Sequence, residues 1–152
     1  MEKLLISACL LGESCRYDGK SNPLPAATLA ALRERFELLP VCPERDGGMP
    51  TPRVPSERRG ERVVNREGED VTGFFARGAE KALALAESSG CRKALLKERS
   101  PSCGSDMIYD GGFSGTLIPG MGVTAERLRA AGTEVLGESR WTELIAKGSP
   151  DD

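Results

Sequence analysis

The feature that most restricts how this chain can fold is a set of three short apolar runs. Each run is followed within a few residues by a cysteine. The runs and their cysteines are 4–6 with Cys9, 38–41 with Cys42, and 94–96 with Cys103. Short runs that are apolar on both faces are typical of parallel strands covered by helices. Because Pro43 and Pro101 restrict the backbone after the last two runs, we expect these strands to end in loops that carry a thiol.

Segments with apolar residues at helical spacing separate these runs. They predict helices at 26–36 and at 125–131. A further helix is expected to begin at Asp70 or Thr72 as its cap residue and to end at about residue 88. A fourth strand is expected at 133–136. Alternating strands and helices form a parallel sheet with helices on both faces. The expected fold class is α/β: a small Rossmann-like three-layer domain with a mainly parallel sheet of about four strands, the first of them central.

Two segments lie outside this alternation. The insertion at about 45–69, rich in proline and glycine, is far longer than the usual connection of about 4 to 6 residues. Within it, Arg62–Asn65 followed by Glu67 and Gly68 predicts a β-hairpin-like flap over the strand ends. A C-terminal tail at about 139–152 follows the fourth strand, and we expect residues 1–152 to form a single domain.

Charge and hydrophobicity narrow the classes of partner. The net charge is −2, so the chain has no basic footprint for a nucleic acid polymer, and a small-molecule substrate fits better. No apolar run approaches the roughly 18 residues of a membrane span, which predicts a cytoplasmic protein without a membrane partner. We expect a monomer or a weak homo-oligomer.

The cysteine and histidine counts restrict the chemistry further. Five cysteines in a cytosolic chain favour free thiols or metal ligands over a disulfide framework. The chain has no histidine, which excludes Ser-His-Asp and Cys-His catalysis and every metal site that needs an imidazole. Any chemistry must therefore use cysteine, carboxylate, hydroxyl, lysine or arginine.

Ligands of open α/β sheets bind beyond the carboxyl ends of the strands. The residues that follow the predicted strands, and that we expect at one rim, are Cys9, Cys42, Glu44, Ser100, Cys103 and, after the fourth strand, Glu138. Cys91 precedes the third strand, so we expect a structural role for it. The position of Cys15 leaves its role open.

Thiols without histidine suit an iron-sulfur cluster or a zinc site built from cysteine alone. A zinc site with Cys15 as fourth ligand would be closed to substrate, whereas a cluster on three cysteines would leave one iron open. Glu44 is the candidate general acid or base, and Ser100 could position a substrate or water. The candidate substrate contacts are Arg16, Asp18, Arg53 and Ser102.

Two other interpretations remain open from these residues. One is a binding module that holds zinc or an iron-sulfur cluster without catalysis. The other is a metal-free sulfur-transfer enzyme in which Cys103 forms a persulfide. The pair Gly120 and Gly122 before a helix is only faintly like a phosphate cradle and does not follow a strand, so no nucleotide site is predicted.

Several motifs together resemble domain-of-unknown-function family 523, which includes the thiouracil desulfidases. The motifs are Ser7-Ala8-Cys9-Leu10, Arg16-Tyr17-Asp18-Gly19, Val41-Cys42-Pro43-Glu44, Gly47-Gly48-Met49-Pro50-Thr51-Pro52-Arg53, Leu96-Lys97-Glu98-Arg99-Ser100-Pro101-Ser102-Cys103-Gly104, Tyr109-Asp110-Gly111 and Gly120-Met121-Gly122-Val123-Thr124. The resemblance covers about residues 3 to 138 and is specific through the combination of its motifs.

The resemblance implies a 4Fe-4S cluster held by three cysteines, which correspond to Cys9, Cys42 and Cys103. The implied reaction removes sulfur without net redox change from a small thiolated nucleobase such as 2-thiouracil, the open iron of the cluster taking the sulfur. It implies Glu44 and Ser100 as the catalytic side chains. Cys15 could compete as a ligand or carry sulfur.

Overall fold

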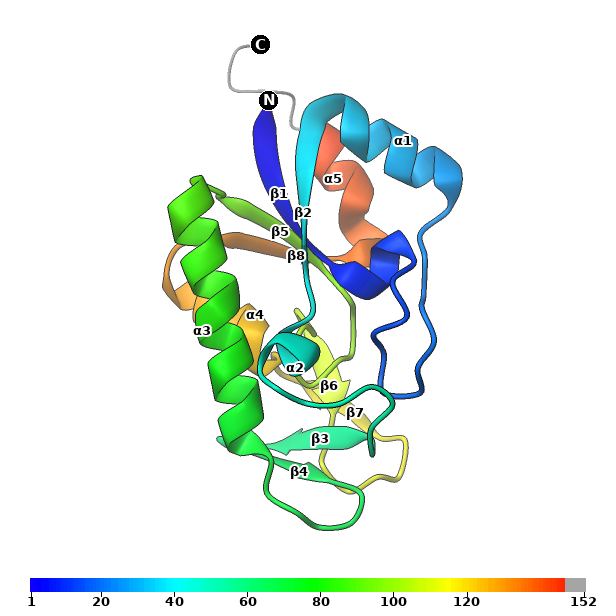
Figure 1. The fold of residues 1–152 in the computed structure, drawn as a ribbon, viewed down its shortest axis with the longest axis vertical. Helices are drawn as coiled ribbons and strands as arrows, with labels where there is room; N and C mark the ends of the chain where they lie inside the picture. Colours follow the sequence, from blue (N-terminus) through cyan, green and yellow to red (C-terminus); the bar gives the residue numbers. More distant parts are fainter. Residues whose placement is uncertain (147–152) are drawn as a thin grey trace.

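The computed structural model describes residues 1–146, and Figure 1 shows their fold. A parallel sheet of four strands lies at its centre, in the order β2-β1-β5-β8. The strands are β1 (Glu2–Ser7), β2 (Phe36–Val41), β5 (Lys93–Leu96) and β8 (Glu134–Gly137). All four predicted strands are present, and β1 lies inside the sheet as expected.

Helices cover both faces of this sheet, which gives the three predicted layers (Figure 1). Helices α1 (Ala26–Arg35) and α5 (Trp141–Ala146) lie on one face, and α3 (Thr72–Ser89) and α4 (Val123–Ala130) on the other. In β1, Leu4 and Ile6 pack with Leu32 of α1, whereas Leu5 packs with Leu128 of α4. Because β1 is buried on both faces, its sequence is continuously apolar rather than alternating.

The start of α3 differs from the prediction. Val71 occupies the N-cap position, not Asp70 or Thr72. The Asp70 carboxylate still accepts the Thr72 N–H at 2.9 Å, and the Thr72 hydroxyl accepts the Val63 N–H at 2.9 Å. Both side chains therefore tie the beginning of α3 to the chain before it. The tail helix α5 ends at Ala146, and residues 147–152 of the predicted tail lie outside the described residues.

The insertion contains the expected hairpin, but the main turn lies earlier than predicted. Strands β3 (Ser56–Arg59) and β4 (Arg62–Asn65) pair in antiparallel register around Gly60. The predicted turn at Gly68 also exists, with a φ of 84°, yet only one bridge, between Val64 and Asp70, lies beyond it. The sequence indicated the second strand of this hairpin and missed the first, because Ser-Glu-Arg-Arg has no apolar alternation.

A second hairpin lies in the glycine-rich segment, where the sequence predicted no strand. Strands β6 (Met107–Tyr109) and β7 (Leu117–Pro119) each span three residues. Strands this short give too few residues for a periodicity to be visible. In Figure 1 both hairpins lie beyond the carboxyl ends of the sheet strands, on the same side of the molecule.

One helical turn, α2 (Pro43–Asp46), follows β2 and carries Glu44. Pro43 occupies its first position, where the missing N–H has no helical partner to lose. The turn lies directly against α3, at Gly78. The approach is so close that a Cβ at this position would overlap the Pro43 carbonyl group. Gly78 therefore sets how closely the segment that bears Glu44 packs on the body of the protein.

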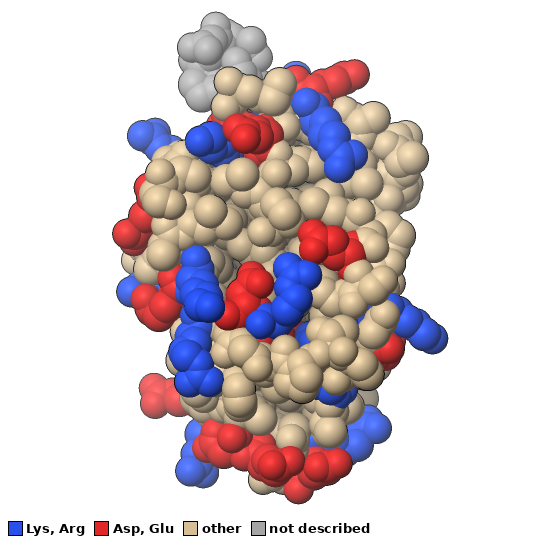
Figure 2. All heavy atoms as spheres, in the orientation of Figure 1, with Lys and Arg blue, Asp and Glu red and all other residues tan. Residues whose placement is uncertain are grey.

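The surface carries charges of both signs. On the face in Figure 2, Lys and Arg side chains are interspersed with Asp and Glu, and acidic side chains gather at the lower end, around the β3–β4 hairpin. The view shows no continuous basic stripe of the kind that follows a phosphate backbone. Within residues 1–146, no helix combines the length and the apolar character needed to cross a bilayer.

We predict that Gly78→Ala destabilises the protein by on the order of 1–3 kcal/mol, because the added methyl group must push α2 away from α3. Chemical denaturation of the metal-free protein measures the change. Gly73→Ala in the same helix is the matched control, since its methyl group meets only the flexible Arg77 side chain at 3.5 Å. Equal stability of the two variants would contradict the proposed close contact.

Candidate active site

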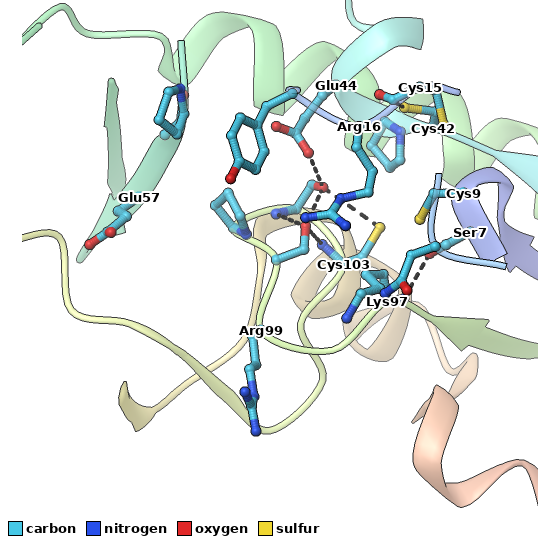
Figure 3. A pocket seen from close by; sticks show the side chains of 18 of the residues that line it. Ser7, Cys9, Cys15, Arg16, Cys42, Glu44, Glu57, Lys97, Arg99 and Cys103 are labelled. Atoms are coloured by element: carbon cyan, nitrogen blue, oxygen red, sulfur yellow. Dashed lines mark hydrogen bonds between the residues drawn. The ribbon is translucent and has the colours of Figure 1, made fainter. Parts of the chain in front are cut away.

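A cavity of about 490 Å³ lies beyond the carboxyl ends of β1, β2 and β5. Five of the residues that we expected at one rim line this cavity: Cys9, Cys42, Glu44, Ser100 and Cys103. Three of the predicted substrate contacts line it as well: Arg16, Arg53 and Ser102. Figure 3 shows the labelled thiols grouped on one side of this cavity, with Glu57 and Arg99 on the other. The parallel sheet thus brings together residues that are up to 94 positions apart in the chain, from Cys9 to Cys103.

Each thiol sits just after a strand. Cys9 lies in the 3-10 turn η1 (Ala8–Leu11), Cys42 precedes α2, and Cys103 lies in the loop after β5. Their exposed fractions are only 7%, 7% and 4%. Burial raises the pKa of Cys9 to about 11 and the pKa of Cys103 to about 12. Buried thiols of this kind form thiolates only when a positive group such as a metal compensates the charge.

Cys42 differs because a neighbouring thiol donates to it. A hydrogen bond from Cys15 lowers the pKa of Cys42 to about 7, and the same bond raises the pKa of Cys15. The Cys42 sulfur also lies 3.7 Å from the Cys15 carbonyl oxygen. Cys15, whose role the sequence left open, therefore stands beside Cys42 on the wall of the cavity.

Cys91 lies away from this cavity, as predicted. Its sulfur is 3.3 Å from the Lys3 carbonyl oxygen and 3.2 Å from that of Lys93, at the beginning of β5. Among residues 1–146, no three Cys, Asp or Glu side chains converge on a point that could hold a single metal ion. Thiolates that bind different irons of one cluster need no such common point.

Glu44 ends a chain of hydroxyl groups. The Ser102 hydroxyl donates to Glu44 Oε2 at 3.2 Å and lies 2.9 Å from the Ser100 hydroxyl. Ser100 Oγ accepts the N–H groups of Ser102 and Cys103, both at 3.1 Å. Because Ser100 Oγ already accepts two bonds, its own proton is available to Ser102. The order of donation then runs from Ser100 through Ser102 to the Glu44 carboxylate.

The loop that carries these serines is fixed by the beginning of α4. The N–H groups of Val123 and Thr124 donate to the carbonyl oxygens of Pro101 and Ser102, at 2.9 and 2.8 Å. A Cβ on Gly122 would overlap the Ser102 backbone, so only glycine allows this approach. The helix start therefore binds the protein's own loop, which accounts for a glycine motif that is not a phosphate cradle.

Arg53 is buried behind Glu44. Its side chain is 4% exposed, and its Nε lies 3.5 Å from Glu44 Oε1. Its terminal nitrogens donate to the Cys15 carbonyl at 3.0 Å and to the Thr51 hydroxyl at 3.2 Å. We predicted Arg53 as a substrate contact; the structure places it on the cavity wall and directs most of its donors to the protein itself.

The other two charged candidates differ in position. Arg16 lines the cavity, whereas Asp18 is not among the lining residues. Asp18 accepts the Lys20 N–H at 3.0 Å and lies 3.9 Å from the Arg16 guanidinium. Asp18 is therefore connected to the cavity through Arg16.

The family model described as 2-thiouracil desulfurase matches residues 4–140 of this chain. The chain belongs to the 2-thiouracil desulfurase family. The protein YbbK of Bacillus subtilis (strain 168) is 39% identical to it over 93% of this chain and 99% of YbbK. A solved structure described as the 4Fe-4S-dependent thiouracil desulfidase TudS (DUF523) is 50% identical, with 97% of each chain covered and a TM-score of 0.92.

These findings confirm the predicted family, its desulfidase class and the predicted α/β fold. Sequence reasoning missed Ser7 and Lys97, which also line this cavity. The Lys97 N–H donates to the buried Ser7 hydroxyl at 2.8 Å, and that hydroxyl in turn opposes the effect of burial on the pKa of Cys103. Both residues belong to the quoted family motifs, which was the signal that could have identified them.

Glu138 was expected at the rim, yet it is not among the lining residues. Its carboxylate instead lies 2.9 Å from the Lys97 ammonium group. The turn after β8 thus contacts the cavity wall indirectly, through Lys97, which follows β5.

We predict that Arg53→Met lowers the free energy of unfolding by about 3 kcal/mol, because the Glu44 carboxylate would remain largely buried without its cation. Denaturation of the metal-free protein measures this. The control is Arg45→Met, which breaks an ion pair with Glu13 whose side chains are both 41% exposed; it should change stability by less than about 1 kcal/mol. Similar losses in both variants would count against a special role for the buried pair.

Proposed function

We propose that this protein is a 4Fe-4S-dependent desulfidase that converts a small thiolated pyrimidine such as 2-thiouracil into the oxygen analogue. The reaction consumes one water and releases hydrogen sulfide, so a C=S bond becomes C=O and no electrons are transferred. Membership of the 2-thiouracil desulfurase family and the 50% identity to a structure described as a 4Fe-4S-dependent thiouracil desulfidase support the activity. The meeting of three buried thiols with Glu44 in one cavity is the observation that carries the proposal.

The donor set fits an iron-sulfur cluster. Cys9, Cys42 and Cys103 come from the ends of three neighbouring strands and line one cavity, and the sequence has no histidine that could replace one of them. We assign these three as cluster ligands. When bound, the cluster would supply a Lewis-acidic iron without a protein ligand, open to the sulfur of the substrate.

The protein's own groups would manage water and protons. Glu44, held by Arg53 on one side and by Ser102 on the other, would take a proton from the attacking water. Once protonated, Glu44 would return the proton through the Ser102 hydroxyl toward the departing sulfur or the ring, the reverse of the donation in the resting site, while Ser100 holds the Ser102 hydroxyl in place. Arg16 lines the same cavity and is our candidate for orienting the ring through its polar edge.

The cellular setting follows from the same chemistry. Because buried free thiols persist in a reducing compartment, we propose a cytoplasmic location. The proposed partner is the small thiolated base, without a nucleic acid polymer or a membrane. We retain the prediction of a monomer or weak homo-oligomer.

We predict that Cys9→Ala, Cys42→Ala and Cys103→Ala each abolish both the brown colour and the release of sulfide from 2-thiouracil. Each change removes a ligand, and anaerobic purification with iron and sulfide analysis measures the loss. Cys91→Ala is the matched control, because its sulfur lies at the beginning of β5, and it should keep about four iron per chain. Colourless, iron-free and active wild-type protein would contradict the requirement for a cluster.

We predict that Glu44→Gln keeps the cluster but lowers kcat by roughly 10²- to 10⁴-fold, the range of general acid–base catalysis. The amide has nearly the shape of the carboxylate and cannot take the proton. Steady-state sulfide release and the absorption spectrum together measure the two effects. Full turnover with an intact cluster would assign the proton transfer to another group, and a loaded but wholly inert wild type would support a binding module.

A further inference from the structure

A second charge pair lies at the wall of the cavity, apart from Glu44. The Lys97 ammonium group is 2.9 Å from Glu138 Oε1 and 3.2 Å from the Glu98 carbonyl oxygen. Lys97 lines the cavity, and its side chain is only 24% exposed. In Figure 3, Lys97 and Glu44 lie on different sides of Cys103. The mechanism described above makes no use of this ammonium group.

The loops after β5 and β8 hold Lys97 through reciprocal contacts. Glu138 Oε2 accepts the Glu98 N–H at 2.6 Å, and Glu98 Oε1 accepts the Ser139 N–H at 2.7 Å. The Glu98 side chain fills the space beside Gly137, where a Cβ would overlap it. The two carboxylates therefore fasten the loops to each other, and the lysine cannot swing away without breaking this arrangement.

Lys97 is also fastened to the thiol side of the site. Its N–H donates at 2.8 Å to the hydroxyl of Ser7, which is 2% exposed and lies two residues before Cys9. Lys97 shares the cavity wall with Cys9 and Cys103. Water screens a charge less at a partly buried position such as that of Lys97, so this cation acts more strongly on negative charge nearby than an exposed one would.

We propose that Lys97, positioned by Glu138, is a fixed positive charge that stabilises the thiolates and the released sulfur on this side of the cavity. The inference rests on the proposed function, because the negative charge comes from the cluster ligands and from the sulfide product. Glu138 is a positioning residue that acts through Lys97. Of the two paired residues only Lys97 lines the cavity, so its positive charge acts on the site more strongly than the negative charge of Glu138 does.

The two partners should shift the reduction potential of the bound cluster in opposite directions. Removing the Lys97 charge leaves the site more negative, which disfavours uptake of an electron and lowers the potential. Removing the Glu138 charge while Lys97 stays protonated makes the site less negative and raises it. If the pair only held the loops together, both changes would admit water and shift the potential the same way.

The experiment uses the anaerobically purified, cluster-loaded protein. Lys97→Met, Lys97→Arg and Glu138→Gln are compared with wild type by redox titration of the cluster, iron content and steady-state desulfuration of 2-thiouracil. We expect a lower potential and a roughly ten-fold lower kcat for Lys97→Met, a higher potential for Glu138→Gln, and wild-type values for Lys97→Arg.

Lys93→Met is the matched control. Lys93 lies at the other end of β5 and forms its own pair with Glu2 at 3.4 Å, so this change should leave the potential unaltered.

Potential shifts of the same sign in Lys97→Met and Glu138→Gln, or an unchanged potential in Lys97→Met, would overturn the inference. If Lys97→Met loses its iron, Lys97→Arg decides: retained iron supports a charge requirement, whereas equal loss shows a packing role and overturns the proposal. Failure of the proposed function would look different, because the wild-type protein itself would then bind no cluster or release no sulfide.

Discussion

The contact between the loop after β5 and the beginning of α4 supports most of the site. Two N–H groups of α4 bind the Pro101 and Ser102 carbonyls, and Gly122 allows the approach because it has no side chain. The satisfied backbone holds the loop in a conformation in which Ser100 accepts two N–H groups and Cys103 faces the cavity. Without this contact the loop would lie exposed at the sheet edge, and the hydroxyl chain would lose its fixed order.

Burial of polar groups is the second constraint, and the structure meets it with paired charges. Glu44 has Arg53, which reaches back to the Cys15 carbonyl, and Lys97 has Glu138. An unpaired charge would be costly in these surroundings, so the cavity wall carries Glu44 and Arg53 as a pair, and Lys97 with its partner just behind the wall. Burial keeps the pKa of Cys9 raised even though the Lys97 charge opposes it, so the further positive charge of a cationic cofactor suits these thiols.

The sequence alone predicted the parts of the fold that depend on local pattern. The four sheet strands and the main helices follow from apolar periodicity, which is visible within any one segment. The hairpin β6–β7 was missed because each strand has only three residues. The hydrogen bond from Ser102 to Glu44 was also out of reach, since it joins residues 58 positions apart whose loop geometries depend on other elements.

What the sequence determined by itself was the residue chemistry: thiols at strand ends, no imidazole, and a carboxylate close to Cys42. Parallel topology then required these strand ends to share one edge. Only the tertiary structure decided that Ser102 rather than Ser100 contacts Glu44, that Arg53 lies behind it, and that Lys97 is held by Glu138. Those choices depend on packing between distant segments, where a single absent Cβ, as at Gly122, sets which atoms can meet.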